Sequence, residues 1–573
     1  MEDSKQHIIL VHGYLLRGPG SNIYSCNLAK TWKAQGHAVT VYCQDPQAKL
    51  YPWVDDFIGP NECLPEARIS LGKVRVVVPD IGGLLPVYNY DKYPGYTVKT
   101  IPQCTTDEIE AHIRKMSEAI RRGINLWGCD QIIANHALLS PVNVKRAVEG
   151  LNVPFKIKIH GSALVFTLQP FPKFKPYAIE AFRECSHIIA GTHHVVQQLK
   201  GIFEDDYLQL NDKLIIIPPG MDPDLFIPST NMHESLQEFR ATIKNHIQTE
   251  EYKGRNAAII SYPAAEKNIH NELKKLGTGY NIRVCDSDLL ERIPDLQLED
   301  PIIIYFGMMM PFKGVAEILL SWLQVTKRYH RAKLILVGFG EYREHLETMI
   351  YALKHDDIAL FESAALSPND QGVTFLEQGI DVRQYFPRTL SNKDGRSVLQ
   401  TSQLNRQGKN TCDKETNGHN GVDILEKILV TGYLNHDELH WLLPLADIAI
   451  MAPKGPEAFG MVSVEAMSAG VLPLLAAHSG LLDVLDTVKQ LDPELEEQMH
   501  ITAVAGGQFK AMHGQHLVEV LPGKICTALE FLYPVEQGGL NDHTKRHSVG
   551  RRLRDIATKT WSWDGICKAL ITQ

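Results

Sequence analysis

The sequence predicts an α/β protein built from two Rossmann-like, parallel-sheet domains that face each other across a cleft. Short runs of β-branched residues alternate with helical stretches over residues 1–226, and a second alternation begins near residue 300. Such alternation is typical of parallel α/β sheets. A chain of 573 residues is too long for one hydrophobic core, so at least two domains are expected.

The first predicted domain, residues 1–226, opens with a strand–loop–helix–strand unit. A strand is predicted at residues 7–11, a helix at about 22–35 and a second strand at 38–43. Gly36 separates that helix from the second strand. Further strands are predicted at residues 131–134, 156–160, 187–190 and 213–217.

The second predicted domain spans residues 300–550. Its apolar residues Val315, Ile318, Leu319, Trp322 and Leu323 fall at helical spacing. Strands are predicted at residues 302–306, 333–337, 427–431, 448–451 and 471–475.

Three other segments complete the predicted organisation. Residues 227–299 are polar and irregular, which predicts an inserted linker region. Residues 391–421 are rich in Asn, Gln, Lys and Gly and cannot bury much apolar surface, so we expect a flexible loop there. The amphipathic segment 551–573 is predicted to be a C-terminal helix that crosses back to the first domain.

Composition excludes several classes of protein. The net charge of −9 argues against a general nucleic-acid binder. No stretch of about 18 apolar residues is present to span a membrane, and the first apolar run is too short for a signal peptide. The ten cysteines form no CxxC pair and no zinc-like spacing with histidine. We therefore expect a cytoplasmic protein with free thiols and no metal site.

A pair of glutamates is the sharpest chemical signal. Glu457 and Glu465 lie eight positions apart in PEAFGMVSVEAMSAG, residues 456–470, where a loop turns into a helix. Eight helical residues rise about 12 Å, comparable to the separation of hexose and ribose across a diphosphate. One carboxylate could accept hydrogen bonds from sugar hydroxyls and the other from ribose hydroxyls. The alternative is two glutamates on an exposed helix face.

The start of this helix is a candidate phosphate site. Backbone N–H groups at a helix N-terminus favour anions. The residues whose N–H groups would face a diphosphate are Phe459, Gly460, Met461 and Val462.

Two further loops could contact phosphate. Lys313 follows a predicted strand and precedes a helix that begins near Gly314, so its ammonium could meet a pyrophosphate leaving group and stabilise the charge that develops on it. Gly18 and Gly20 lie between a strand and a helix, where glycine lets a backbone approach phosphate closely. The alternatives are a solvated surface lysine and a plain tight turn.

Two histidines follow predicted strands. His160 stands at a strand end and is followed by Gly161, and His136 follows the strand over 131–134. Each is either a site residue or a structural histidine, and His136 is the weaker candidate.

Taken together, these stretches resemble a known family. The glutamate pair is similar to the motif of retaining glycosyltransferases of the GT-B fold, closest to glycosyltransferase family 4 (group 1). Four other stretches match that family in the right order: RGPGSNIY at 17–24, KIHGSAL at 158–164, IIIPPGMDPDLF at 215–226 and YFGMMMPFKGV at 305–315. Each motif alone is weak, but the ordered set is specific.

The resemblance implies a retaining transferase that moves a hexosyl unit from a nucleotide-diphosphate sugar to a hydroxyl acceptor, with no cofactor and no metal. It implies that Glu457 positions the sugar, that His160 lines the sugar pocket, and that backbone near Tyr433 and Leu434 contacts the base. The leaving phosphate would help to deprotonate an acceptor that attacks from the front face. The acceptor, whether sugar, lipid or small molecule, and any peripheral membrane contact stay open.

One residue departs from the family pattern. Met308 stands five positions before Lys313, where family members usually carry Arg or Lys. We take Arg17, beside the glycine loop, as the candidate substitute for the missing cation. A non-catalytic nucleotide-sugar-binding protein and a GT-B-fold sugar-nucleotide epimerase remain alternatives. An α/β-hydrolase, suggested by LVHGY at 10–14, is excluded because the sequence has no G-x-S-x-G turn.

Overall fold

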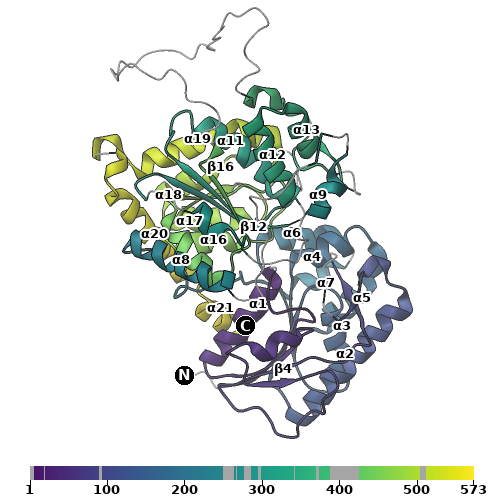
Figure 1. Cartoon of the computed structure of the whole chain (residues 1–573). Helices are drawn as coiled ribbons and strands as arrows, with labels where there is room; N and C mark the ends of the chain where they lie inside the picture. The colour runs from purple at the N-terminus through teal and green to yellow at the C-terminus, as the bar shows by residue number, and fades with distance from the viewer. Residues whose placement is uncertain are drawn as a thin grey trace, which may run out of the picture.

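The structure is a computed structural model of the whole chain. It describes residues 5–18, 20–88, 93, 95–204, 206–248, 263–265, 268–276, 285–293, 298–340, 342–369, 373–377, 379–386, 425–503, 512–537 and 539–573. Figure 1 shows two α/β halves, the N-terminal one in purple and blue and the C-terminal one in green and yellow. The loop expected at 391–421 lies outside the described residues.

The N-terminal half is built on a parallel sheet of eight strands in the order β10-β9-β8-β7-β1-β2-β4-β3. Its strands are β1 (His7–Val11), β2 (Ala38–Tyr42), β3 (Asp56–Ile58), β4 (Val74–Val77), β7 (Gln131–Asn135), β8 (Phe155–Lys158), β9 (His187–Ala190) and β10 (Leu214–Ile216). A separate pair joins β5 (Leu84–Val87) to β6 (Thr97–Thr100). The short strands β3 to β6 were not predicted from the sequence.

Both faces of this sheet are covered. Along β1, Ile8 and Leu10 face one core while Ile9 and Val11 face the other, as the two-residue period of a strand requires. The helices are α1 (Gly20–Ala34), α2 (Thr106–Trp127), α3 (Ser140–Val148), α4 (Gly161–Ala163), α5 (Lys175–Glu184), α6 (His193–Ile202) and α7 (Tyr207–Asn211), and a π-helix, η3 (Leu164–Leu168), follows α4. The longest, α2, begins with a capping box between Thr105 and Glu108.

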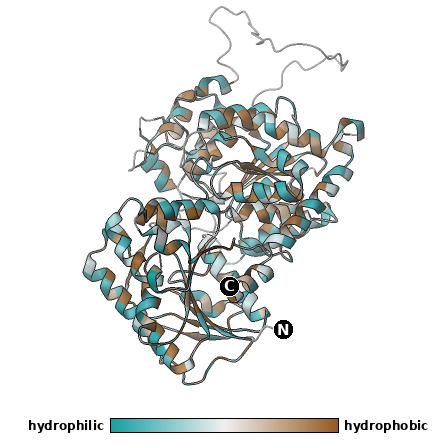
Figure 2. Ribbon diagram, turned by 180° about the vertical axis from the view of Figure 1, so that it is seen from behind, coloured by the Kyte–Doolittle hydropathy of each residue, from teal (hydrophilic) through white to brown (hydrophobic). Residues whose placement is uncertain are grey.

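The C-terminal half is built on a six-stranded parallel sheet in the order β13-β12-β11-β14-β15-β16. Its strands are β11 (Ile302–Met308), β12 (Lys333–Phe339), β13 (Ile428–Gly432), β14 (Ile448–Met451), β15 (Leu472–Ala476) and β16 (His500–Ile501). Its helices are α11 (Val315–Val325), α12 (Arg343–His355), α13 (Ile358–Leu366), α15 (His436–Leu442), α16 (Met461–Ser468), α17 (Gly480–Leu491), α18 (Pro493–Met499) and α19 (Gly514–Leu532). Figure 2 shows the helices banded in teal and brown, as amphipathic helices around a sheet must be.

The segment 227–299 adds helices to this second half. In its described part lie α8 (Met232–Gln248), α9 (His270–Leu276) and α10 (Leu289–Arg292). Phe239 and Ile243 of α8 are buried in the same core as the second sheet, and α8 packs on α15. These helices are therefore part of the C-terminal core in addition to connecting the two halves.

The chain passes between the halves twice, and the two crossings pair with each other. Met221 N–H donates to the Trp561 carbonyl at 2.7 Å, and Trp563 N–H donates to the Met221 carbonyl at 3.1 Å. The second crossing lies between two helices. Before it, α20 (Thr544–Trp561) packs on α16, and after it α21 (Trp563–Thr572) packs on α1. Figure 1 shows α21 beside α1 in the N-terminal half.

None of the helices in the described part of the chain is long and apolar enough to cross a membrane.

A close packing contact at this crossing generates a stability prediction. A Cβ at Gly220 would lie 2.6 Å from Cδ2 of Trp563. We expect Gly220→Ala to lower the free energy of unfolding by about 1–3 kcal/mol, because the ring and the paired backbone must shift together. Thermal and urea unfolding measure this change.

The matched control is Gly523→Ala in α19. Nothing lies within 4 Å of a Cβ there, so the helix should gain stability. Equal midpoints for wild type and Gly220→Ala would contradict the predicted packing.

Candidate active site

A pocket opens at the carboxyl edge of the second sheet. It lies where the strand order reverses, because the chain continues from β11 to β12 on one side and from β14 to β15 on the other. Ligands of open α/β sheets bind at such switch points. The lining residues are Tyr305, Phe306, Gly307, Lys313, Met451, Ala452, Pro453, Glu457, Gly460, Val462 and Leu481.

An ion pair joins two of the predicted site residues. Lys313 Nζ contacts Glu457 Oε2, and each side chain is about one quarter exposed, at 25% and 24%. Gly314, which follows the lysine, has φ of 74°, and a Cβ there would lie 2.2 Å from the Ala452 carbonyl oxygen. Glycine thus allows the lysine loop to approach the loop that carries Glu457.

The lysine and glutamate loops are bonded along their backbones. The N–H groups of Lys454 and Gly455 both donate to the Phe312 carbonyl, at 2.6 and 3.1 Å. Behind them, Lys454 Nζ forms an ion pair with Glu317 Oε1 of α11 at 2.6 Å. Burial raises the pKa of Glu317, and Lys454 opposes that rise. The lysine loop and the glutamate loop are therefore held together by backbone hydrogen bonds and by an ion pair.

Helix α16 begins at the pocket. Gly460, with φ of 87°, precedes the helix, and both Gly460 and Val462 line the cavity. The helix N-terminus therefore faces the space beside Lys313, as an anion site requires. The Phe459 side chain is buried instead against Trp561, with ring centroids 6.3 Å apart, which leaves only its backbone for a ligand.

Glu465 lies within α16, further from the helix start. The side chain is buried, and burial raises the pKa of its carboxyl from 4.5 to about 7. His436 Nε2 lies 3.8 Å from Glu465 Oε1 at the start of α15, two residues after the buried Leu434. Leu434, His436 and Glu465 thus belong to the α15–α16 side of the site.

Loops of the first domain meet the glutamate loop from the opposite side. A Cβ at Gly20 would lie 4.0 Å from Met461 Sδ, and one at Gly161 would lie 3.3 Å from Ala458 Cβ. Thr192 Oγ1 donates to the Ala458 carbonyl at 2.9 Å. The residues around Glu457 are therefore enclosed by both domains.

His160 lies in a histidine-rich cluster at the carboxyl edge of the first sheet. Its Nε2 is 3.2 Å from Asn135 Oδ1, and its ring stands edge-on to Tyr24 with centroids 5.1 Å apart. Burial lowers the pKa of His160 well below its usual range, so the ring is neutral at neutral pH. The ring of the buried His136 lies beside it, tilted by 54°, with centroids 4.9 Å apart.

The glycine loop places Arg17 outside the pocket lining. Arg17 is exposed, its carbonyl accepts from Asn22 Nδ2 at 2.8 Å, and Gly18 has φ of 98°. Within the described ranges, Lys313 is the only cation that lines the pocket. Met308 ends β11, and its carbonyl accepts from Tyr305 Oη at 2.7 Å.

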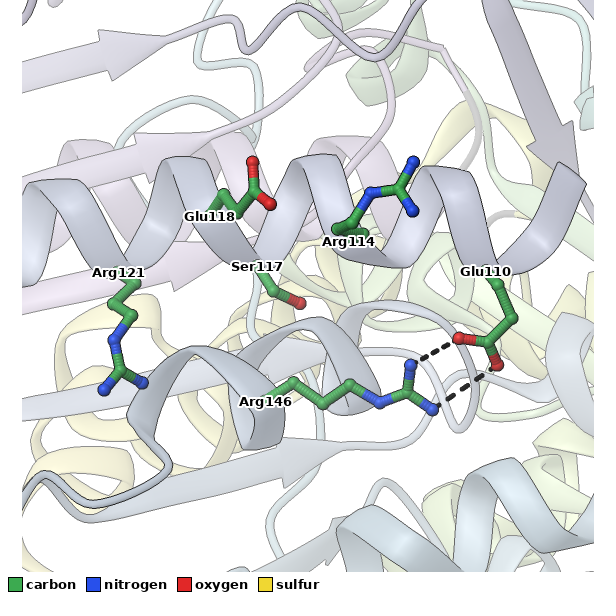
Figure 3. Close-up of a pocket in the computed structure, with 6 residues that line it drawn as sticks. All are labelled: Glu110, Arg114, Ser117, Glu118, Arg121 and Arg146. Carbon is green, nitrogen blue, oxygen red and sulfur yellow. Dashed lines mark hydrogen bonds and ion pairs between the residues drawn. The ribbon is translucent and has the colours of Figure 1, made fainter. Parts of the chain in front are cut away.

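A second cavity, of about 320 Å³, lies between α2 and α3 (Figure 3). Arg146 already has carboxylate partners: its Nη1 lies 2.6 Å from Glu110 Oε2, and its Nε lies 3.0 Å from Glu180 Oε1. We interpret it as a solvated ion network. In the part of the chain that the structure describes, no group of three or more His, Cys, Asp or Glu residues is placed to hold a metal ion.

Several residues around Glu457 were not predicted from the sequence. Thr192 follows β9, and His478 and Ser479 follow β15, where they contact the glutamate loop. Their position directly after parallel strands is the signal that could have found them.

The site can be compared with known proteins. Residues 416–490 match the family model "Glycosyl transferases group 1". They carry a group 1 glycosyl transferase domain. This stretch includes Leu434, Glu457, Gly460 and Glu465, so the glutamate loop and α16 belong to the group 1 domain. No curated protein sequence matches the chain.

Solved structures resemble the whole chain. A glycosyltransferase from Rickettsia africae ESF-5 is 13% identical, with a TM-score of 0.50 over 99% of this chain and 97% of that one. The trehalose-6-phosphate synthase OtsA is 10% identical, with a TM-score of 0.50 over 99% and 98%. Sucrose-phosphate synthase from Thermosynechococcus elongatus is 14% identical, with a TM-score of 0.49 over 99% and 97%. At these identities the likeness concerns the fold, and the predicted GT-B fold of two facing parallel-sheet domains is confirmed.

The raised pKa of Glu465 generates a pH prediction. Its carboxyl holds a proton more tightly in the folded chain, with a pKa of about 7 against 4.5, so folding loses stability as pH rises through that window. We expect Glu465→Gln to reduce this loss, which is at most about 3 kcal/mol. Urea unfolding at about pH 5 and about pH 8 measures it.

Glu272→Gln, at a glutamate side chain that is 52% exposed, serves as the control and should behave as wild type. An unchanged pH dependence in Glu465→Gln would show that Glu465 titrates near its ordinary pKa.

Proposed function

We propose that the chain is a retaining glycosyltransferase that moves a hexosyl unit from a nucleoside-diphosphate sugar to a hydroxyl acceptor. The observation that carries this proposal is the Lys313–Glu457 pair beside the start of α16, in a pocket whose Glu457 side lies within the stretch that matches the group 1 model. A cation and a helix N-terminus together suit a diphosphate, and a carboxylate next to them suits sugar hydroxyls.

Donor binding would exchange the partners of this ion pair. The Lys313 ammonium would turn from Glu457 to the diphosphate, beside the start of α16 at Gly460. Glu457 would then accept hydrogen bonds from the hexose. Glu465, Leu434 and the α15 start would take the ribose and base. Each charged group thus has a partner both before and after the donor binds.

The chemical step breaks the bond between the anomeric carbon and the diphosphate oxygen. Negative charge develops on that oxygen, and Lys313 with the α16 N-terminus stabilises it more in the transition state than in the ground state. The acceptor hydroxyl attacks from the same face, and its proton passes to the leaving phosphate. Glu457 aligns the sugar for this attack.

The first domain supplies the opposite wall. His160 is neutral and therefore suits a hydroxyl group better than a phosphate. It lies on the loop whose Gly161 contacts Ala458, next to Glu457. The acceptor is a sugar, a lipid or a small molecule that offers a hydroxyl group.

The absence of a cation at Met308 also favours a second function. The chain would then bind nucleotide-sugars without catalysing transfer. With Lys313 as the only cation among the described lining residues, leaving-group stabilisation would be weaker than in a site with two. Donor binding without turnover against any acceptor or water would select this function.

The donor proposal is tested by thermal stabilisation with a panel of UDP-, GDP- and ADP-sugars. At about 100 times its Kd, a donor should add about 2.7 kcal/mol to the free energy of unfolding. Lys313→Ala should lower donor turnover by about 10²–10³-fold, because one charge-stabilising contact is lost, and Glu457→Gln should also lower it. Turnover is measured as nucleotide release.

Lys327→Ala is the matched control, because this exposed lysine lies in the turn after α11 and its ammonium donates to Gln324 Oε1. No stabilisation by any sugar nucleotide, or normal turnover in both site variants, would refute the proposed function.

We further propose that Arg17 supplies the second cation after the donor has bound. Its loop leads into α1, whose first residue Gly20 faces Met461 at the start of α16. Arg17→Ala should lower turnover by about tenfold or more, while exposed Lys49→Ala should have no effect. Wild-type turnover in Arg17→Ala would show that the chain works with Lys313 alone.

A further inference from the structure

A chain of hydrogen bonds reaches the backbone of Glu457 from the loop that follows β15. His478 Nε2 lies 2.6 Å from the Pro453 carbonyl, and His478 Nδ1 lies 3.0 Å from Ser479 Oγ. The backbone N–H of Glu457 then donates to Ser479 Oγ at 2.8 Å. These bonds join four residues in one series, His478 and Ser479 of the β15–α17 loop with Pro453 and Glu457 of the glutamate loop.

Hydrogen-bonding chemistry allows one assignment of the protons in this series. A carbonyl can only accept, so Nε2 of His478 carries the hydrogen that it donates to Pro453. In a neutral ring Nδ1 is then an acceptor, and the Ser479 hydroxyl donates to it. The serine oxygen keeps a lone pair for the Glu457 N–H. His478 is buried, and burial lowers its pKa, which keeps the ring neutral.

The backbone of Ser479 is strained. Its φ of 49° and ψ of −140° lie where glycine is favoured, at a cost of about 1–3 kcal/mol for other residues. The next residue, Gly480, packs so closely that a Cβ would lie 2.4 Å from the Ala458 carbonyl oxygen. Such strain persists when surrounding contacts hold it, and the contacts of the serine hydroxyl do so here.

Glu457 is therefore held at both of its backbone groups. Ser479 accepts from its N–H, and the N–H of Gly480 donates to its carbonyl at 2.8 Å. The next carbonyl, that of Ala458, accepts from Thr192 of the other domain. The position of the Glu457 carboxylate thus depends on these bonds as well as on Lys313.

We propose that His478 and Ser479 are positioning residues, which fix the backbone of Glu457 so that its carboxylate meets the hexose of the donor. This inference rests on the proposed function. It predicts a selective effect, because Glu457 faces the sugar while the α15–α16 side of the site holds the nucleotide. Removing the series should weaken hexose placement and leave nucleotide binding intact.

The central experiment is Ser479→Gly. Glycine relieves the strained φ and removes the hydroxyl, so the chain should fold with an unchanged or higher thermal midpoint. We expect donor turnover to fall by about 10- to 100-fold and affinity for the nucleotide-sugar chosen by the donor panel to drop. Affinity for the matching free diphosphate, UDP, GDP or ADP, should stay at the wild-type value.

A second variant tests the histidine. His478→Gln keeps an N–H donor for the Pro453 carbonyl, but its acceptor oxygen does not occupy the position of Nδ1 beside Ser479 Oγ. It should likewise have a lower affinity for the nucleotide-sugar and an unchanged affinity for the free nucleotide.

Two controls separate this effect from general ones. Asp356→Gly relieves another positive φ, of 57°, at the end of α12, and Thr487→Ala removes a hydroxyl that bonds to the Asp483 carbonyl within α17. Neither should change turnover.

The possible outcomes are distinct. Wild-type turnover in Ser479→Gly would overturn the inference, and so would an equal loss of nucleotide-sugar and free-nucleotide binding, which marks a merely structural role. If the wild-type chain itself neither binds nor turns over any sugar nucleotide, that result refutes the proposed function, whatever the variants do.

Discussion

The close approach of the lysine loop to the glutamate loop is the constraint on which the site depends. Lys313 and Glu457 are 144 positions apart in sequence and meet because Gly314 lets the backbone after β11 lie against Ala452 after β14. Any side chain at Gly314 would collide with a carbonyl oxygen, which cannot move without disturbing β14. The backbones that carry the two charges are therefore fixed by packing before any ligand binds. Only the lysine side chain has to turn when a diphosphate binds, so little reorganisation remains for the transition state.

The acidic groups of the site differ in what burial does to them. Glu317 is buried and paired with Lys454, so it holds the glutamate loop against α11 and does not face a ligand. Glu465 is buried with His436 at 3.8 Å, and its pKa of about 7 means that a partner which favours the carboxylate would draw a proton from it. A ribose hydroxyl that donates to Glu465 would be such a partner. Nucleotide binding in this pocket should thus be coupled to proton release near neutral pH.

The donor helix is also tied to the connection between the domains. Ser468, the last residue of α16, donates its hydroxyl to the Phe226 carbonyl at 2.7 Å. Arg554 of α20 binds the same carbonyl at 2.8 Å and that of Ser468 at 3.1 Å. One end of α16 therefore faces the pocket while the other is held by the crossing segments. A relative movement of the domains would be transmitted to the helix that faces the diphosphate, because the far end of that helix is held by the crossing segments.

Sequence reasoning found the residues whose role depends on local pattern and missed those whose role depends on distant contacts. The strands β1, β7, β11 and β12 are apolar runs, whereas β6 has Val98 as its one apolar residue and shows no such run. The glutamate pair has a fixed spacing, but Ser479 acquires its role only because β15 ends beside the loop of β14. A serine in a helix-start sequence is ordinarily a cap, yet Ser479 makes no cap bond to α17 and gives its oxygen to Glu457. Sequence spacing cannot show that Ser479 bonds to Glu457 instead of capping α17, because this choice depends on strand order and on the close packing at Gly480.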